Sequence, residues 1–313
     1  GGRPGGAGPG GAPSGRLQGV EQEGEKTMGK IVIVGSGPAG CSAALYAARA
    51  GQEVVVISMG MGALSKAELI QNYYGFEEGI TGAELYRQGV AGAKAVGAEF
   101  ITAEVVGLDY TGSLVVQTTE GDYPADAVIL ATGTGRIAPK IAGLAEHEGR
   151  GVSYCATCDA FFYRGKTAAV LGSGEYALHE VQALLPLAGR VILCTNGEPL
   201  TADFPEGVEI CTEKLAAVEG EEKVSALRLE NGELLPVEGL FVALGVAGSA
   251  ALARKLGAPV ENGRIVVDEK MQTGIPGLYA AGDCTGGLLQ VCKAVYEGAL
   301  AATEAIKQIR GKK

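Results

Sequence analysis

The sequence predicts an α/β protein in which a β-branched strand, a glycine-rich turn and a helix occur twice along the chain. The first copy starts near residue 31 and the second near residue 168, and each is followed by a hairpin pattern and a loop of small residues. With 313 residues, of which 47% are apolar, the chain is long enough for two hydrophobic cores. We therefore predict two Rossmann-like domains of the three-layer ββα type.

The second domain is expected to be inserted in the first. The segment "GIPGLYAAGDCTGGLLQVCKAVYEGALAATEAIKQI" supplies one more strand, a loop and a long helix, which would complete the first domain. We expect residues 28–143 and 266–313 to form that domain and residues 144–265 to form the insertion. Residues 1–27 contain ten Gly, three Pro and few apolar side chains, so we expect a disordered N-terminal extension.

The first glycine motif lies between a predicted strand and a predicted helix, which is the context in which such a motif indicates nucleotide binding. The run from Ile31 to Val34 enters "GSGPAG", a segment of helical spacing then ends at Gly51, and the strand "EVVVIS" follows. Glycines permit the tight turn, and the helix N-terminus offers N–H groups and a positive dipole to a pyrophosphate. The motif predicts a dinucleotide site, with a merely tight strand-to-helix turn as the alternative. Ser58 stands where NAD would require a carboxylate, which disfavours a simple NAD site.

The second copy repeats this plan. A strand from Ala168 to Leu171 enters "GSGEYA", a helix follows, and the next strand ends near Cys194. Its hairpin, "VSALRLENGELLPVEGLFVALG", carries an Asn231-Gly232 pair that is a strong signal for a tight turn. The first copy has "SLVVQTTEGDYPADAVILATG" at the corresponding place. The two halves are therefore related nucleotide-binding-like units.

The net charge and the cysteine content indicate which classes of binding partner and which cellular compartment to expect. A formal net charge of −10 argues against nucleic acid and anionic membrane surfaces, since both bind basic footprints. No apolar run approaches the roughly 18 residues that a membrane span needs. Seven cysteines at scattered spacings do not resemble a secreted disulfide framework, and no signal peptide is visible. We expect a cytoplasmic protein that acts on small molecules or proteins.

The segment "GVSYCATCDAFFYRG" places Cys155 and Cys158 at CxxC spacing with Asp159 directly behind. A tetrahedral zinc site needs four ligands, and the chain has no second CxxC and only two histidines, His147 and His179, so no metal is expected. The spacing favours a redox dithiol, because CxxC turns let both sulfurs meet and often lower one thiol pKa. An inert CxxC is the alternative. Asp159 is the candidate proton carrier, or else a helix-capping carboxylate.

From about residue 30 to residue 310 the chain resembles the low-molecular-weight thioredoxin reductases. The motifs that carry the resemblance are "GSGPAG", "ATG" at 131–133, "CATCD" at 155–159, "GSGEYA" at 172–177 and "GLYAAGD" at 277–283, with "LQV" shortly after. The resemblance implies an FAD flavoprotein and homodimer that passes electrons from flavin to the Cys155-Cys158 pair, with Cys158 nearer the ring. Thiol-disulfide exchange would then reduce a thioredoxin-like partner protein.

The resemblance also implies site residues. The first glycine motif would hold the FAD pyrophosphate, Asp283 the ribitol region, and the Gln290-Val291 turn the pyrimidine edge, with Asn72 beside the flavin. Asp159 joins the two cysteines as a catalytic residue. The expected cofactor-binding residues are Gly35, Ser36, Gly37, Pro38, Ala39, Gly40, Asn72, Ala131, Thr132, Gly133, Gly282, Asp283, Gln290 and Val291.

The second glycine motif departs from the pattern of NADPH-dependent members. Residues 193–207 contain no Arg or Lys where those members carry a basic cluster, and Asn196 stands where NADH would want a carboxylate. Losing two charge-assisted hydrogen bonds would cost roughly two to four decades in affinity. The chain is therefore similar to the ferredoxin-dependent flavin thioredoxin reductases, which implies reduced ferredoxin as donor. An acidic ferredoxin would need a basic patch, either Arg164 and Lys166 or the C-terminal Lys307, Arg310, Lys312 and Lys313, and the alternative for these residues is an ordinary solvated face.

Other functions stay open at this point. They are an NAD(P)H-dependent thioredoxin reductase with an atypical pocket, an FAD-dependent small-molecule dithiol oxidase, and a non-catalytic nucleotide-binding regulator. We expect Cys41, Cys194 and Cys211 to be packing residues and His179 to be structural, while Cys284 and Cys292 could form a second thiol pair.

Overall fold

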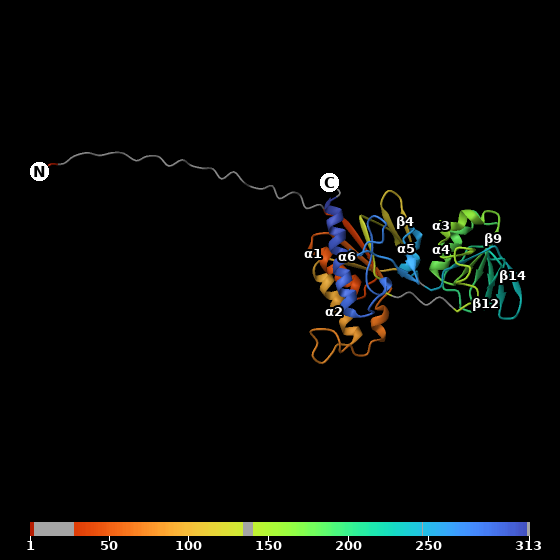
Figure 1. The fold of residues 1–313 in the computed structure, drawn as a ribbon, viewed down its shortest axis with the longest axis horizontal. Helices are drawn as coiled ribbons and strands as arrows, with labels where there is room; N and C mark the ends of the chain where they lie inside the picture. Colours follow the sequence, from red (N-terminus) through yellow and green to blue (C-terminus); the bar gives the residue numbers. More distant parts are fainter. Residues whose placement is uncertain (3–27, 134–139, 246, 312–313) are drawn as a thin grey trace.

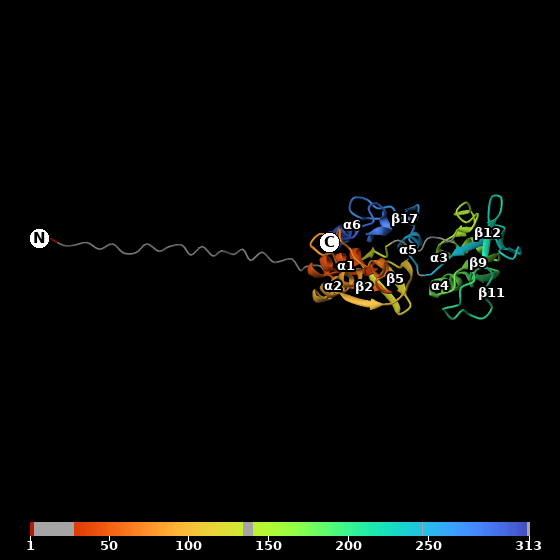
Figure 2. The ribbon, with the colours of Figure 1, turned by 90° about the horizontal axis from the view of Figure 1, so that it is seen from below.

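The computed structural model describes residues 1–2, 28–133, 140–245 and 247–311, and the last three ranges form two lobes (Figure 1). The expected N-terminal extension falls almost wholly outside the described residues. The view from below shows α5 (Ser249–Lys255) between the lobes (Figure 2). The α/β fold class is confirmed, because each lobe has a parallel five-stranded sheet with a helix layer on one face and a three-stranded antiparallel sheet on the other.

The sheet of the first lobe has the strand order β18-β7-β1-β2-β3, with all neighbours parallel. Its strands are β1 (Lys30–Val34), β2 (Glu53–Ser58), β3 (Glu99–Thr102), β7 (Ala127–Leu130) and β18 (Leu278–Ala280). Nearly continuous apolar runs form these strands because both faces of the sheet are covered. The C-terminal strand β18 therefore lies in the same sheet as β1, next to β7.

Alternate side chains of β1 face the two different layers that cover this sheet. Ile31 and Ile33 pack with α1 (Pro38–Arg49) and α6 (Val291–Gly311), whereas Val32 and Val34 pack with the antiparallel sheet. The alanine-rich faces of α1 and α6 let the two helices lie close together. The antiparallel sheet comprises β4 (Val105–Tyr110), β5 (Leu114–Thr118) and β6 (Gly121–Ala125).

The second lobe repeats the arrangement with the strand order β11-β10-β9-β15-β8. Its strands are β8 (Val152–Ser153), β9 (Thr167–Leu171), β10 (Arg190–Cys194), β11 (Glu209–Cys211) and β15 (Gly239–Val242). Helix α4 (Glu175–Leu184) covers one face. The antiparallel strands β12 (Leu215–Glu219), β13 (Ala226–Leu229) and β14 (Leu234–Pro236) cover the other.

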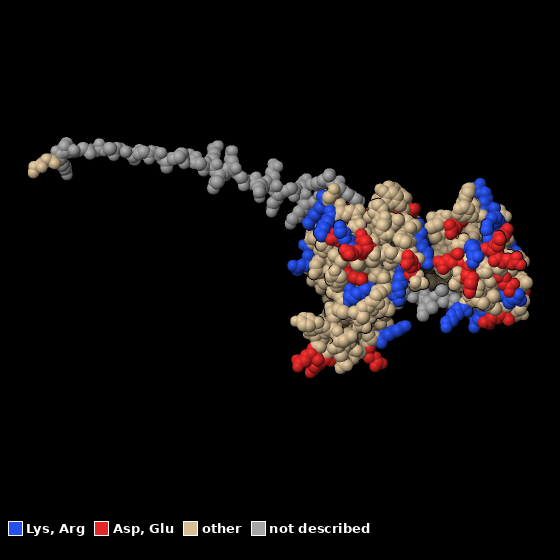
Figure 3. All heavy atoms as spheres, in the orientation of Figure 1, with Lys and Arg blue, Asp and Glu red and all other residues tan. Residues whose placement is uncertain are grey.

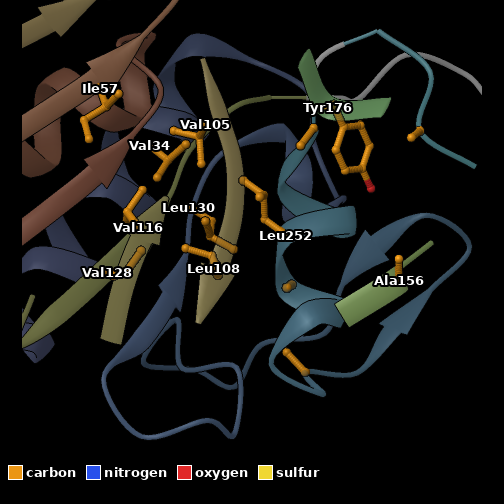
Figure 4. Packing of buried hydrophobic residues seen from close by; sticks show 14 of the residues in the cluster. Val34, Ile57, Val105, Leu108, Val116, Val128, Leu130, Ala156, Tyr176 and Leu252 are labelled. Atoms are coloured by element: carbon orange, nitrogen blue, oxygen red, sulfur yellow. The ribbon is translucent and has the colours of Figure 1, made fainter. Parts of the chain in front are cut away.

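Helix α5 lies within the range that we expected to belong to the inserted domain, yet it packs on the first lobe. It contacts β4, and Leu252 points toward Val105 and Leu108 of that strand (Figure 4). The hairpin of β16 (Val260–Glu261) and β17 (Arg264–Ile265) also joins the first lobe, since Arg264 donates to the Asp283 carbonyl at 2.9 Å. We therefore propose that the inserted unit ends before α5 rather than at residue 265.

The remaining elements are short, apart from one surface helix. They are α2 (Gly82–Ala95), α3 (Ala156–Asp159) and the 3-10 helices η1 (Gly62–Lys66), η2 (Ala160–Tyr163) and η3 (Asp283–Thr285). Across the described ranges, no helix combines the length and apolar character that crossing a membrane requires.

Candidate active site

The first glycine motif forms a tight cradle at the end of β1. Gly35 has φ +107°, and a side chain there would meet the Ala131 carbonyl oxygen at 2.3 Å. A side chain at Gly40 would meet the Gly35 carbonyl oxygen at 1.9 Å, so this glycine lets α1 pack against the turn. Around Gly37, by contrast, the space is open. The cradle therefore leaves the N-terminus of α1 free to accept an anion.

A cavity of about 1100 Å³ opens in front of this cradle. It runs from the α1 N-terminus past the end of β2 to the N-terminus of α6. The expected cofactor-binding residues meet at this one cavity, with the exception of Gly40, which lies beneath the turn. Those lining it are Gly35, Ser36, Gly37, Pro38, Ala39, Asn72, Ala131, Thr132, Gly133, Gly282, Asp283, Gln290 and Val291.

The structure also brings to the cavity residues that were not among the expected cofactor-binding residues. Ser58 lines the wall, and its hydroxyl donates to Ser36 Oγ at 2.7 Å, in place of the carboxylate of a simple NAD site. Residues 59–64 and the pair Ala247-Gly248 also line the cavity. Glycines and small residues in "MGMGAL" and "GVAGSA" are the signal that could have indicated these loops.

Long-range hydrogen bonds fix the cavity walls. Asn72 Nδ2 donates to Gln290 Oε1 at 2.9 Å, although the two residues are 218 positions apart. The Ser249 N–H at the start of α5 donates to Thr132 Oγ1 at 2.8 Å. These bonds connect the "QNYYGF" loop to the α6 turn, and the "ATG" loop to α5.

Cys155 and Cys158 form a disulfide, so the two sulfurs of the CxxC motif meet as expected. Cys155 is buried, with 4% exposure, whereas Cys158 is exposed. The short helix α3 starts after Cys155, and Cys155 Sγ accepts a hydrogen bond from the Cys158 N–H at 3.1 Å. Because the sulfur caps this turn, Asp159 is not its N-cap.

Asp159 lies on the same turn and contacts a serine. Its Oδ2 accepts a hydrogen bond from Ser153 Oγ at 2.6 Å, and Ser153 Oγ also accepts from the Cys155 N–H at 3.1 Å. A serine hydroxyl therefore connects the carboxylate to the backbone of the buried cysteine. This arrangement can hold a proton near the dithiol, and the role of Asp159 as proton carrier stays a prediction.

A buried ion pair lies beneath the dithiol. Glu180 of α4 accepts hydrogen bonds from the Ala156 N–H and from Lys255 Nζ, and the side chains of Glu180 and Lys255 are each only 1% exposed. Burial raises the pKa of Glu180, but hydrogen bonds from His179 and Lys255 outweigh it and lower the pKa overall. Sequence reasoning missed this pair. A carboxylate within the buried stripe of α4 was the available signal.

The dithiol and the cavity lie at opposite ends of α5. Gly248, the N-cap of α5, lines the cavity, whereas Cys158 Sγ lies 3.6 Å from the Lys255 carbonyl oxygen at the other end. Seven helical residues span about 10 Å. In this arrangement neither cysteine lines the cavity.

The two histidines and the buried cysteine Cys284 have contacts that are typical of structural residues. Both His147 ring nitrogens lie within 3.0 Å of backbone carbonyl oxygens, and His179 packs against Gly107 of β4. Cys284 is buried and donates to the Ala281 carbonyl oxygen, whereas Cys292 is exposed on α6. Among the described residues, no group of three or more His, Cys, Asp or Glu side chains could hold a metal ion.

A dinucleotide cavity in one lobe and a CxxC disulfide on a second, similar lobe define a two-domain disulfide oxidoreductase. The family model described as pyridine nucleotide-disulphide oxidoreductase matches residues 29–298. The chain belongs to this family. A thioredoxin reductase from Aquifex aeolicus is 35% identical over 90% of this chain and 94% of its own length.

Solved structures show the same relationship. The atypical thioredoxin reductase TRi from Desulfovibrio vulgaris Hildenborough is 40% identical, has a TM-score of 0.85, and covers 90% of this chain and 98% of its own. A ferredoxin-flavin thioredoxin reductase from Clostridium acetobutylicum is 35% identical, with a TM-score of 0.69 over 91% of this chain and 99% of its own. The chain is thus a flavoprotein disulfide reductase of the low-molecular-weight thioredoxin reductase group, as the motifs suggested.

FAD is the cofactor of this family, and the cavity has the features to hold it. The first turn of α1 carries no acidic residue, and its N-cap, Gly37, places no side chain over the N–H groups. The cradle can therefore accept a pyrophosphate. FAD supplies two-electron redox chemistry, and Asn72, Asp283 and Gln290 are among the polar residues of the cavity lining that would orient it.

Gly35→Ala should strongly reduce FAD binding. The added Cβ would meet the Ala131 carbonyl and would also force a residue with a side chain to adopt φ +107°, so we expect at least about tenfold weaker affinity. The measurement is flavin absorbance per mole of purified protein during FAD titration. Gly112→Ala is the matched control, because Gly112 has φ +95° but open space around it. Equal flavin affinity in the two variants would refute the cradle assignment.

Proposed function

We propose that this protein is a thioredoxin reductase that passes electrons through FAD and the Cys155-Cys158 pair to the disulfide of a thioredoxin-like protein, with reduced ferredoxin as the donor. The observation that carries the proposal is the CxxC disulfide with one buried and one exposed cysteine, on a lobe attached to an FAD-binding lobe. The similarity to the ferredoxin-flavin thioredoxin reductase from Clostridium acetobutylicum supports the choice of donor.

The surface beside the dithiol is suited to a protein partner. Phe161 and Phe162 are 65% and 67% exposed, and they follow Cys158 on the 3-10 helix η2. Arg164 stacks over the Phe161 ring at 5.3 Å. Aromatic and arginine side chains are enriched in protein interfaces. We infer that this surface receives the partner disulfide.

The exchange reaction uses the residues of the dithiol turn. A cysteine thiolate of the reduced pair attacks the partner disulfide, and the second cysteine sulfur then displaces the partner, re-forming the Cys155-Cys158 disulfide. Two electrons and two protons thus pass to the partner. Asp159, connected to the Cys155 backbone through Ser153, would hold the proton for the departing sulfur.

We infer that a pyridine nucleotide would lie at the N-terminus of α4 in the inserted lobe, and protein groups lie close to that terminus. Hydrogen bonding from the backbone of Tyr176, at the start of α4, acts on the pKa of Glu104, which comes from the first lobe. Burial and the nearby Glu175 raise the pKa of Glu104, although this hydrogen bond lowers it. Two carboxyl groups therefore stand at the helix N-terminus where a pyrophosphate would bind.

The loop after β10 also lies against this turn. The Thr201 N–H donates to the Ser173 carbonyl oxygen at 2.8 Å, and Thr201 Oγ1 lies 3.0 Å from where a Gly174 side chain would begin. The same loop has no Arg or Lys from residue 193 to residue 207. Both steric access and charge therefore disfavour NADPH as the donor.

Ferredoxin docking requires positive charge on an acidic protein. Arg164 and Lys166 lie beside the dithiol, over the rings of Phe161 and Tyr163 respectively. At the C-terminus Lys307 pairs with Glu304 at 2.6 Å, and Lys312 and Lys313 lie outside the described residues. Figure 3 shows acidic and basic side chains intermixed over the visible face. We therefore favour Arg164 and Lys166 as the docking cations.

An anaerobic donor screen tests the proposal. We expect reduced ferredoxin to bleach the flavin absorbance and NADPH and NADH to leave it unchanged, because Glu104 and Glu175 lie at the α4 N-terminus and residues 193–207 contain no Arg or Lys. The ferredoxin rate should fall as salt rises, since screening weakens charge steering between the proteins.

Glu104→Ala separates the two reasons for excluding NADPH. This variant opens the α4 N-terminus but adds no cation, so it should still not respond to NADPH.

Rapid bleaching of the wild-type flavin by NADPH would overturn the donor assignment. Rapid flavin reoxidation by oxygen without turnover of a thioredoxin-like protein would instead indicate a dithiol oxidase. The homodimer and the cytoplasmic location stay predictions.

A further inference from the structure

A second pair of cysteines lies side by side in the inserted lobe, outside the active site. Cys194 ends β10 and Cys211 ends β11, and the two are direct partners in the parallel register. Both pack on the same hydrophobic cluster, so their side chains share one face of the sheet. The Thr195 N–H donates to the Cys211 carbonyl oxygen at 2.9 Å and holds the register.

The two thiols differ in access and in acidity. Cys194 is fully buried, whereas Cys211 lies on the edge strand and is partly exposed. A hydrogen bond from the Cys194 thiol lowers the pKa of Cys211 to about 6, and the same contact, together with burial, raises the pKa of Cys194. The pair therefore combines an accessible thiolate with an adjacent protonated thiol, which are the two groups that stepwise disulfide formation uses.

We propose that Cys194 and Cys211 form a second redox site, at which a small neutral hydroperoxide oxidises Cys211 and Cys194 resolves the product to a disulfide. The neighbouring carboxylates of Glu209, Glu213 and Glu233 interact unfavourably with negative charge at the pair. Anionic oxidants are therefore disfavoured, and hydrogen peroxide or an alkyl hydroperoxide is the class of substrate that fits.

The reaction balances in two steps. The Cys211 thiolate attacks the peroxide, an S–O bond forms, the O–O bond breaks, and the leaving oxygen takes a proton as water or alcohol. The Cys194 sulfur then attacks Cys211, an S–S bond forms, the S–O bond breaks, and hydroxide leaves with the Cys194 proton as water. One hydroperoxide thus oxidises two thiols, and an added dithiol reverses the change. The strand register already holds the reacting residues adjacent.

The test compares three cysteines in the FAD-loaded protein. After reduction and desalting, the protein is treated with hydrogen peroxide in the presence of dimedone, and its peptides are analysed by mass spectrometry. In the wild type we expect a Cys194-Cys211 crosslink that forms at least about tenfold faster than any modification of the exposed Cys292. In Cys194→Ala we expect dimedone-labelled Cys211 instead.

The wild-type measurement decides the proposal even where the variant folds poorly. Modification of Cys211 no faster than that of Cys292 would overturn it. Sulfenic acid at Cys211 that accumulates in the wild type without a crosslink would overturn the resolving role of Cys194. Because the readout is the chemistry of these thiols alone, it is independent of the electron donor and of thioredoxin turnover.

Discussion

Cys158→Ser should lower reduction of a thioredoxin-like protein by at least about 1,000-fold while FAD stays bound. Cys158 is the exposed cysteine of the pair, and without its sulfur the buried Cys155 cannot re-form the disulfide that releases the partner. Neither cysteine lines the FAD cavity, so the flavin absorbance should be unchanged. The measurement is steady-state reduction of thioredoxin with chemically reduced ferredoxin as donor.

The dithiol should also change the number of electrons that the protein takes up per flavin. Anaerobic dithionite titration of the wild type should take up about two electrons per flavin beyond the two of the flavin itself, because the disulfide accepts one further pair. Cys158→Ser should lose that extra pair, and Cys292→Ser, which changes an exposed thiol on α6, should keep it. Full thioredoxin turnover in FAD-loaded Cys158→Ser would remove the dithiol from the mechanism.

Lys255→Met should lower the free energy of unfolding by roughly 3–5 kcal/mol. The substitution leaves the Glu180 carboxylate buried without its cation, between α4 and α5. Glu180→Gln in the same protein should recover more than half of that loss, because a neutral amide can still accept from the Ala156 N–H. Chemical denaturation of the FAD-loaded variants measures both changes.

An exposed ion pair supplies the matched control. Arg190 and Glu209 lie 2.6 Å apart with 48% and 49% exposed side chains, so Arg190→Met should cost less than about 1 kcal/mol. Similar losses in Arg190→Met and Lys255→Met would show that the buried pair contributes no more than a surface contact.

The Lys255 effect should depend on pH with a definite sign. The pKa of Glu180 is lower in the folded protein than its ordinary value of 4.5, so its contribution to stability is present above about pH 4.5 and is lost as the pH falls. The difference in stability between wild type and Lys255→Met should therefore shrink in acid. A difference that grows as the pH falls below 4.5 would contradict a charged Glu180.

The pair has a further consequence for the dithiol. Glu180 accepts from Ala156, next to Cys155, and the Lys255 carbonyl oxygen lies 3.6 Å from Cys158 Sγ. The ion pair therefore joins the lobes at the dithiol turn. Because the dithiol is one helix length away from the FAD cavity, we infer that electron transfer requires the lobes to rotate and this contact to open.

Local patterns accounted for the glycine cradle, the repeated lobes and the CxxC turn. Each depends on neighbouring residues: Gly35 and Gly40 lie on one turn, and Cys155 and Cys158 lie on another. The position of α5 was not predictable in this way. Its sequence follows the second lobe directly, but its apolar side chains pack on β4, and contacts between lobes leave no periodic signal.

The sequence by itself determined that this is a flavoprotein disulfide reductase, because its recognition motifs are short and their residues act within one turn of the chain. Only the tertiary structure decided which distant residues meet: Asn72 with Gln290, Glu180 with Lys255, Glu104 with the α4 N-terminus, and Cys194 with Cys211. The physical reason is that strand order and lobe packing set these contacts. Both arise from burying apolar surface across the whole chain, which no single segment records.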